Sequence, residues 1–384
     1  MKFSVIIFVF IFLNLTCTAQ KSTHKNIIQF IFTSDAHYGI TRKTFRNDTA
    51  VDGHTVNAAM IKEMNKLPWI HLPLDSGINA GKLTGPIDYV IEGGDIANRM
   101  EIPDQSDAVS WKQFCLDYIN GITLTNHYGK RTKLFIIPGN HDITNAIGFY
   151  KPMKPKVDPA SMVAIYNLMM KPSVNLTTNG YNYPKDKINY SKNIGGIHFM
   201  FITLWPDSSE RIWMGKDLKT VSTKTPVIIF THDQPESEAK HFTNPNKASG
   251  INSTDKFEDL LDEVYKDGTT TVADGGKTDI EQRGWVSFLK KYPNIKAYFH
   301  GNDNFDEYYV YKGPDSTVAL NTFRVDSPMK GAYSLKDETK LSFQVVTIDT
   351  KSLTMTVREC LWNTDPSHPE KNIQWGDSKT ILLN

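Results

Sequence analysis

The feature that most constrains this chain is a set of polar clusters, each of which directly follows an apolar run of strand length. The runs, at 27–33, 89–91, 133–137 and 226–230, are rich in β-prone residues and resemble buried strands. Strands that deliver carboxylate, imidazole and carboxamide groups at their ends predict a metal site at the rim of a sheet. The clusters are Asp35-Ala36-His37, Gly93-Gly94-Asp95, Gly139-Asn140-His141-Asp142 and Thr231-His232-Asp233.

Strand-like and helix-like segments alternate from residue 27, and the pattern becomes almost wholly β after residue 296. This order predicts a layered α/β domain in which two packed sheets, a β-sandwich, are flanked by helices. Helical spacing of apolar residues is found at 56–67, 107–122, 159–170 and 278–292, a hairpin is expected at 188–204, and later strands at 308–310, 318–323, 343–348 and 354–357.

Residues 1–19 predict a signal peptide. A positive start at Lys2 precedes an apolar stretch, and Cys17-Thr18-Ala19 supplies small residues for cleavage before Gln20. The alternatives are a retained membrane anchor, for which the apolar stretch is short, and lipidation at Cys17. We expect export to the periplasm or outside the cell and, after removal of the signal, no transmembrane segment.

We expect one catalytic domain over residues 20–364 and a polar, irregular tail over 365–384. Cys115 and Cys360 remain after cleavage; they could pair in an exported chain or stay as two buried free thiols. The net charge of +1 gives no electrostatic argument for a nucleic-acid polymer, so affinity for a phosphate-bearing ligand would have to come from a local site. The oligomeric state is open.

In order and residue type, the clusters resemble the motifs of the calcineurin-like metallophosphoesterase superfamily. That superfamily carries Asp-x-His, Gly-Asp, Gly-Asn-His-Asp/Glu, a lone His and then Gly-His-x-His. The organisation matches over roughly residues 27–350, and the resemblance is specific at the motifs. It implies a β-sandwich flanked by helices and an enzyme that hydrolyses phosphomonoesters or phosphodiesters, with a small phosphorylated substrate as its partner.

The resemblance also implies two divalent metal ions, drawn from manganese, zinc, iron or magnesium. Asp35, His37 and Asp95 would hold the first ion. Asp95 would bridge to the second ion, which Asn140 and His232 would also hold. Two adjacent cations neutralise phosphate oxygens and lower the pKa of a shared water, so that a metal-bound hydroxide attacks phosphorus.

The resemblance makes His141 and Asp142 the catalytic pair. His141 would face the substrate and give a proton to the departing oxygen, and Asp142 would orient the His141 ring. A buried His141 that is simply hydrogen-bonded to Asp142 is the structural alternative.

The chain departs from the superfamily at its last motif, where Gly301-Asn302-Asp303-Asn304 replaces Gly-His-x-His. If this segment is extended, His300, Asn302 and Asn304 share one side and could reach the site. Three explanations are open: the asparagines serve as oxygen ligands and favour harder ions, the site holds one metal or binds two weakly, or the chain is a catalytically weakened or inactive binding protein on the same fold.

Overall fold

The computed structural model describes residues 26–98, 105–144, 158–236, 238, 241–242, 260–265, 279–369 and 373–384. The expected signal peptide and Cys17 lie outside these residues. None of the helices within this part of the chain is long and apolar enough to cross a membrane.

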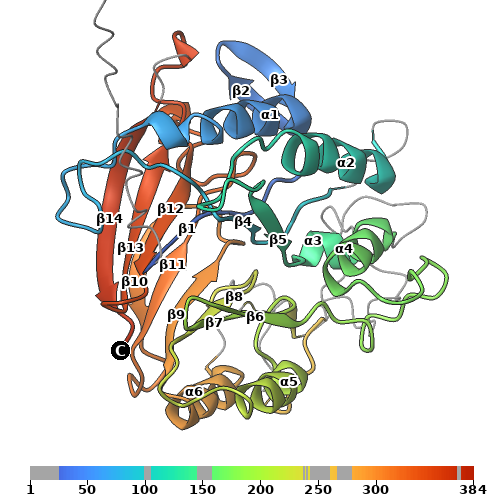
Figure 1. The fold of residues 1–384 in the computed structure, drawn as a ribbon. Coiled ribbons are helices and arrows are strands. Elements are labelled where there is room, and N and C mark those ends of the chain that lie inside the picture. Colours follow the sequence, from blue (N-terminus) through green and yellow to red (C-terminus); the bar gives the residue numbers. More distant parts are fainter. Residues whose placement is uncertain are drawn as a thin grey trace, which may run out of the picture.

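Two six-stranded sheets face each other, which confirms the predicted sandwich (Figure 1). In spatial order, the first sheet contains β14 (Gln374–Leu382), β13 (Thr354–Leu361), β12 (Ser342–Asp349), β1 (Ile27–Thr33), β4 (Tyr89–Glu92) and β5 (Lys133–Ile136). The second contains β10 (Glu307–Tyr311), β11 (Leu320–Arg324), β9 (Ile295–His300), β8 (Val227–Phe230), β7 (Ile197–Phe201) and β6 (Tyr190–Ile194). β1, β4 and β5 are parallel, as are β7, β8, β9 and β11, so the carboxyl ends within each group share a rim.

The core between the sheets is aromatic. From β1, the Phe30 ring lies 5.7 Å from Phe230 and 5.8 Å from Phe299 of the second sheet, and the Phe32 ring lies 5.3 Å from Phe299. All four rings are fully buried, and these three contacts are edge-to-face, which the ring quadrupoles favour. These contacts hold the two sheets together directly below the rim that carries the polar clusters.

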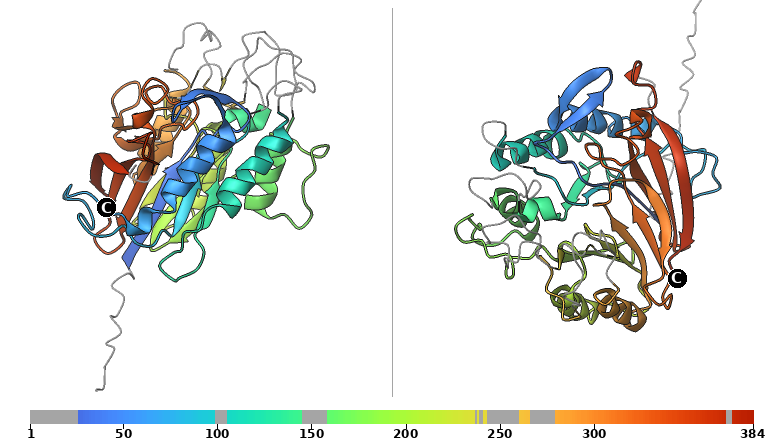
Figure 2. Two further views of the ribbon diagram at one scale, coloured as in Figure 1. Left: turned by 90° about the horizontal axis from the view of Figure 1, so that it is seen from above. Right: turned by 180° about the vertical axis from the view of Figure 1, so that it is seen from behind.

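Helices cover both outer faces (Figure 1, Figure 2). Beside the first sheet lie α1 (Gly53–Met64), α2 (Asp107–Phe114), which continues as a π-helical turn over Cys115–Asn120, and α4 (Ala160–Met170); beside the second lie α5 (Ser208–Leu218) and α6 (Gln282–Lys291). The four predicted helices are confirmed with shifted ends. Short elements complete the description: α3 (Asn140–Thr144), the hairpin β2 (Thr41–Phe45) and β3 (Asp48–Asp52), and 3₁₀ turns at Leu67–Trp69 and Glu338–Lys340.

The C-terminal segment differs from the expectation of an irregular tail. Residues 374–382 form β14, which pairs antiparallel with β13 at the edge of the first sheet. Ile381 is the one buried residue of this strand. With so little apolar alternation, the pairing is carried by backbone hydrogen bonds that a sequence pattern does not reveal. Cys115 and Cys360 are both free thiols.

The buried carboxyl of Asp326, just after β11, should make the stability of the fold depend measurably on pH. Burial raises the pKa of its carboxyl to about 8, so the fold holds a proton that the unfolded chain has already released above about pH 4. Stability linked to this group therefore falls as pH rises from about 4 to about 8. Between pH 5 and pH 8, the free energy of unfolding should fall in the parent and fall less in Asp326→Asn. We expect the two falls to differ by at least about 2 kcal/mol.

Urea unfolding at the two pH values measures the Asp326 effect. Asp48→Asn, which changes an exposed carboxylate of β3, is the matched control and should follow the parent. Parallel pH profiles for Asp326→Asn and the parent would mean that the buried carboxyl ionises at its ordinary pKa.

Candidate metal centre

The loops after β1 and β4 pair with each other and bring the first two clusters together. The Asp35 N–H donates to Gly94 O at 2.8 Å, and the His37 N–H donates to Asp95 O at 2.9 Å. Asp35, His37 and Asp95 have φ angles of 58°, 45° and 55°, so the Asp-x-His segment is not extended. Left-handed conformations are costly for such residues and concentrate at functional sites, where the surrounding structure maintains them.

The Asp95 carboxylate lies at the centre of the site. Its Oδ1 is 3.3 Å from His232 Nε2, and its Oδ2 is 3.7 Å from His37 Nε2 and 3.8 Å from His141 Nε2. Two sets of ligand atoms therefore share Asp95: one with His37 and His141, and one with Asp35 and His232. Each set lies close enough together to hold one cation, and four separate strand ends contribute to them.

Buried polar atoms that lack a hydrogen bond within the described chain indicate whether these residues fit a cation. Asp35 Oδ1, His37 Nε2 and His232 Nε2 are buried and, within the described chain, accept or donate no hydrogen bond. The other ring nitrogen of His232 lies 2.8 Å from Gly93 O, and that of His37 contacts Asn98 Oδ1. Such contacts orient an imidazole and leave Nε2 available, as in metal sites, so these residues fit divalent cations.

The charges at the centre are strongly coupled. Burial alone would raise the pKa of the Asp95 carboxyl, but the His232 and His141 imidazoles outweigh it and hold that pKa well below its usual range. Burial lowers the pKa of His232, but the Asp95 and Asp35 carboxylates outweigh burial and hold this pKa well above its usual value. This field of buried carboxylates would also attract a divalent cation.

Glycines allow the loops to approach this closely. Gly94 has a φ of 102°, and a Cβ at this position would lie 2.5 Å from Gly139 N and 2.8 Å from His232 Nδ1. No side chain larger than hydrogen fits there without moving the loop that carries Asn140. The second glycine of Gly93-Gly94-Asp95 is thus required by the contact between strand ends.

His141, the second residue of α3, is held partly by Asn98, a residue that we did not predict. Asn98 Nδ2 lies 3.0 Å from His141 Nδ1, and the His141 N–H donates to Asp95 Oδ1 at 2.8 Å. Asn98 follows Asp95 by three residues on the same loop, and that proximity was the signal available in the sequence. Because Asn98 also contacts His37, it orients two imidazoles at once.

Asp142 differs from its expected role of orienting His141. Its carboxylate accepts hydrogen bonds from the backbone N–H groups of Gly139 at 2.9 Å, Ala97 at 2.9 Å and Ile96 at 3.2 Å. Burial raises the pKa of this carboxyl to about 7, and the Asp95 charge raises it too. Asp142 therefore ties the loop after β4 to the loop after β5, and Asn98 is the side chain at His141 Nδ1.

Lys330, which we did not predict, enters the site from the loop after β11. Its Nζ lies 3.2 Å from His141 Nε2, although the two residues are 189 positions apart. The loop is anchored at the centre, because Ser327 Oγ donates to Asp35 O at 2.8 Å and accepts from the Lys330 N–H at 2.9 Å. Arg42 of β2 holds the loop as well, donating to Pro328 O at 2.9 Å and to a second loop carbonyl.

The departing motif has Asn302 at φ 64° and Asn304 at φ 59°, so this segment is not extended either. The Asn302 N–H donates to Asp35 Oδ2 at 3.0 Å, and its Nδ2 donates to Gln234 Oε1 at 3.1 Å. Asn304 Nδ2 donates to Asn302 O, whereas its buried Oδ1 has no hydrogen-bond partner among the described residues. The asparagine segment thus touches the metal centre through the backbone contact to Asp35.

His300 directs its ring nitrogens to groups other than the candidate metal ligands. Its Nδ1 is 3.0 Å from Gly301 O and its Nε2 is 3.3 Å from Tyr309 Oη. Burial and the nearby Arg324 guanidinium hold the pKa of His300 well below its usual range. Both ring nitrogens are therefore engaged by neighbours of the segment itself.

Together, the two-sheet sandwich and the ligand groups at its rim form a layered fold with a candidate metal centre. A sequence profile of the calcineurin-like phosphoesterase family matches residues 28–319, and the chain belongs to this family. The predicted family is thereby confirmed, and membership supports metal-dependent phosphoester hydrolysis in general.

One solved structure supports this fold assignment at low sequence identity, and two others are similar to the chain only weakly. A dimetal phosphatase from Danio rerio is similar with a TM-score of 0.50 and 8% identity, over 93% of this chain and 99% of that one. A phosphopantetheinyl hydrolase from Mycobacterium tuberculosis gives 0.32 and 12%, over 79% and 91%, and the calcineurin-like phosphoesterase YfkN from Bacillus subtilis gives 0.29 and 9%, over 92% and 90%. No curated protein sequence matches the chain.

Proposed function

We propose that this protein is an exported hydrolase of small phosphomonoesters or phosphodiesters that works with two divalent cations. Asp35, His37, Asp95, Asn140 and His232 would hold them. The observation that carries the proposal is the position of Asp95, whose two carboxylate oxygens face imidazoles from different strand ends at 3.3 to 3.8 Å. The export part rests on the sequence of residues 1–19 alone.

His141 is the proposed proton donor to the departing oxygen. Bound divalent cations supply charge neutralisation for the phosphoryl oxygens and acidify water. His141 is 13% exposed, so its ring is reachable from solvent while its Nδ1 is held by Asn98. A ring that is held at Nδ1 and has its Nε2 beside the Lys330 ammonium is an arrangement that general acid catalysis can use.

Metal content and turnover of the same preparation test the proposal. Protein purified without chelator is analysed for manganese, zinc, iron and magnesium, and is assayed with an aryl phosphate monoester and an aryl phosphate diester. We expect bound metal, turnover of at least one ester, loss of turnover with a chelator and recovery on adding metal. Metal-free protein without turnover under any of these ions would contradict the proposal.

We expect Lys330 to contribute to substrate binding through its charge. Its ammonium lies beside His141, where a phosphate group would approach, and charge-assisted contacts to phosphate are strong. We expect Lys330→Met to lower kcat/KM by about 10- to 100-fold with metal content unchanged, and Lys330→Arg to retain more activity. Lys336→Met, an exposed lysine of the same loop, is the matched control. Unchanged kcat/KM in Lys330→Met would remove Lys330 from the substrate site.

A phosphate-binding protein on the same fold is the second candidate. It is favoured by Asn302 and Asn304, which stand where the family carries two histidines and whose side-chain amides donate to Gln234 and to Asn302 O. Binding of metal and of a phosphate ester without turnover would support it. Asn302→His and Asn304→His should then raise metal affinity, whereas unchanged affinity would mean that neither position contacts the cation.

A further inference from the structure

A cavity away from the metal centre lies at the open side of the sandwich, where the edge strands of the two sheets, β5 and β6, come near each other. It measures roughly 640 Å³, within the ~300–1,000 Å³ typical of small-molecule sites. Its walls also include the π-helical turn and the end of α4. None of the metal-centre residues lines it, so it is separate from the proposed active site.

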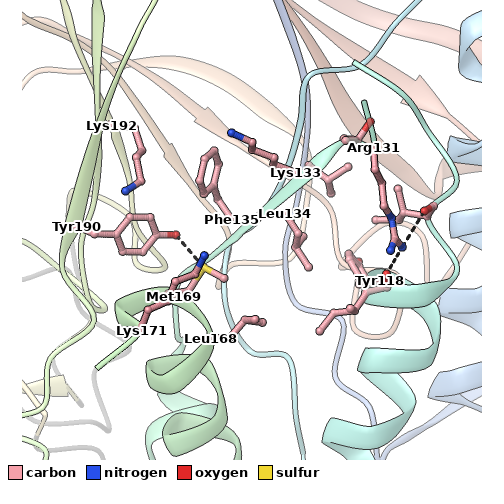
Figure 3. A pocket seen from close by; sticks show the side chains of 14 residues that line it. Tyr118, Arg131, Lys133, Leu134, Phe135, Leu168, Met169, Lys171, Tyr190 and Lys192 are labelled. Carbon is pink, nitrogen blue, oxygen red and sulfur yellow. Dashed lines mark hydrogen bonds between the residues drawn. The ribbon is translucent and has the colours of Figure 1, made fainter. Parts of the chain in front are cut away.

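The floor of this cavity is apolar. Leu134 and Phe135 of β5 and Leu168 and Met169 of α4 face it and are only half-buried, although they lie in a concave surface (Figure 3). Tyr190 closes one side, and its hydroxyl bonds the backbone N–H and C=O of Ile136 at 3.1 and 2.8 Å, which satisfies that part of the β5 edge. Apolar surface that a fold leaves accessible inside a depression favours an apolar ligand group.

The charged residues of the lining are all cations: Arg131, Lys133, Lys171 and Lys192. Figure 3 shows Lys171 and Lys192 on the Tyr190 side of the cavity and Arg131 on the Tyr118 side. Within the residues that the structure describes, none of the four forms an ion pair with a carboxylate. Arg131 donates to the backbone oxygens of Ile119 and Ile122, and Lys192 lies 5.9 Å from the Tyr190 ring centre.

We propose that this cavity binds a single-chain amphiphile with an anionic headgroup, such as a fatty acid. The apolar floor would take the acyl chain, and the three lysines would neutralise the headgroup. Charge complementarity selects this occupant, because the whole chain has a net charge of only +1 while the lining carries four cations and no acid. Each buried methylene strengthens binding, and an ammonium–carboxylate contact sets the orientation.

Calorimetric titration with laurate, at concentrations at which it stays monomeric, tests the proposal. Dodecyltrimethylammonium provides the same chain with the opposite charge, and acetate provides the headgroup alone. We expect laurate to bind at least about tenfold more tightly than either, with an affinity that falls as salt is added. Equal binding of dodecyltrimethylammonium, or equal binding of acetate, would overturn the proposal, as would adsorption to anionic phospholipid vesicles without any binding of laurate.

Variants assign the binding to this cavity. The double variant Lys171→Gln/Lys192→Gln, which changes exposed side chains, should weaken laurate binding at least about tenfold. Leu168→Trp should block the chain while leaving the cations in place. The matched control is Lys219→Gln/Lys224→Gln, two exposed lysines outside the lining, which should bind as the parent does. Parent-like binding in both cavity variants would place the ligand elsewhere and overturn the proposal.

Discussion

Replacing Asp95 by alanine is expected to remove both bound metal and turnover. The Asp95 carboxylate is shared by the two sets of ligand atoms, so its loss takes one ligand from each. Charge stabilisation by such cations amounts to several kcal/mol, which corresponds to a loss in kcat/KM of at least about 10³-fold. The measurement is metal content by elemental analysis, together with the rise in Tm that added metal produces in the parent and should not produce in Asp95→Ala.

Asp88→Asn is the matched control for this experiment. Asp88 is another buried carboxylate next to an imidazole, but it precedes β4 whereas Asp95 follows it; its Oδ2 accepts from the Gln29 N–H at 2.9 Å and lies 2.8 Å from His127 Nδ1. Folded Asp88→Asn protein should keep its metal and its activity. Metal retained in Asp95→Ala at the parent's level would show that Asp95 does not hold the cations.

His141→Ala is expected to remove most turnover while leaving metal content close to that of the parent. General acid catalysis contributes about 10²- to 10⁴-fold, and we expect kcat to fall by that factor. The loss should be largest for esters with poor leaving groups, because an alkoxide needs the proton more than a nitrophenolate does. Steady-state kinetics with a series of aryl and alkyl phosphates measures this difference.

His141 also stands within ligand distance of His37 and Asp95, and the same variant distinguishes the two roles. A proton donor can be removed without loss of metal, whereas a ligand cannot. If His141→Ala loses metal in proportion to activity, His141 is a ligand that compensates for the missing histidines at 302 and 304. Asn98→Ala, which frees the ring without removing it, should lower kcat less than His141→Ala does.

The large elements were predictable because burial leaves a local pattern. The isoleucines and phenylalanines of β1, β5 and β8 mark strands, and a polar cluster after each marks a rim. β14 and the hairpin of β2 and β3 lack such a pattern, because most of their side chains are exposed. α5 was missed for a related reason: three of its side chains, Glu210, Met214 and Leu218, are buried, and one of them is charged.

At the site, residue types were easier to predict than conformations. The alternation rule for extended chains placed His300, Asn302 and Asn304 on one side. Positive φ angles at Asn302 and Asn304 break that alternation, and Asp35 and His37 have positive φ angles as well. Such angles depend on contacts between loops, such as the Asp35 N–H with Gly94 O, and those contacts join residues about sixty positions apart.

The sequence by itself determined the buried strands that precede the polar clusters, the order of these candidate metal-binding clusters and the family, because these follow from local periodicity and from residue types that metal chemistry restricts. The tertiary structure alone decided which groups surround His141. Asn98 holds its ring, Lys330 reaches it across 189 positions, and Asp142 serves the backbone instead. The physical reason is that charge and hydrogen bonding act through space between loops, and no local pattern records which distant loops the packing of two sheets will bring together.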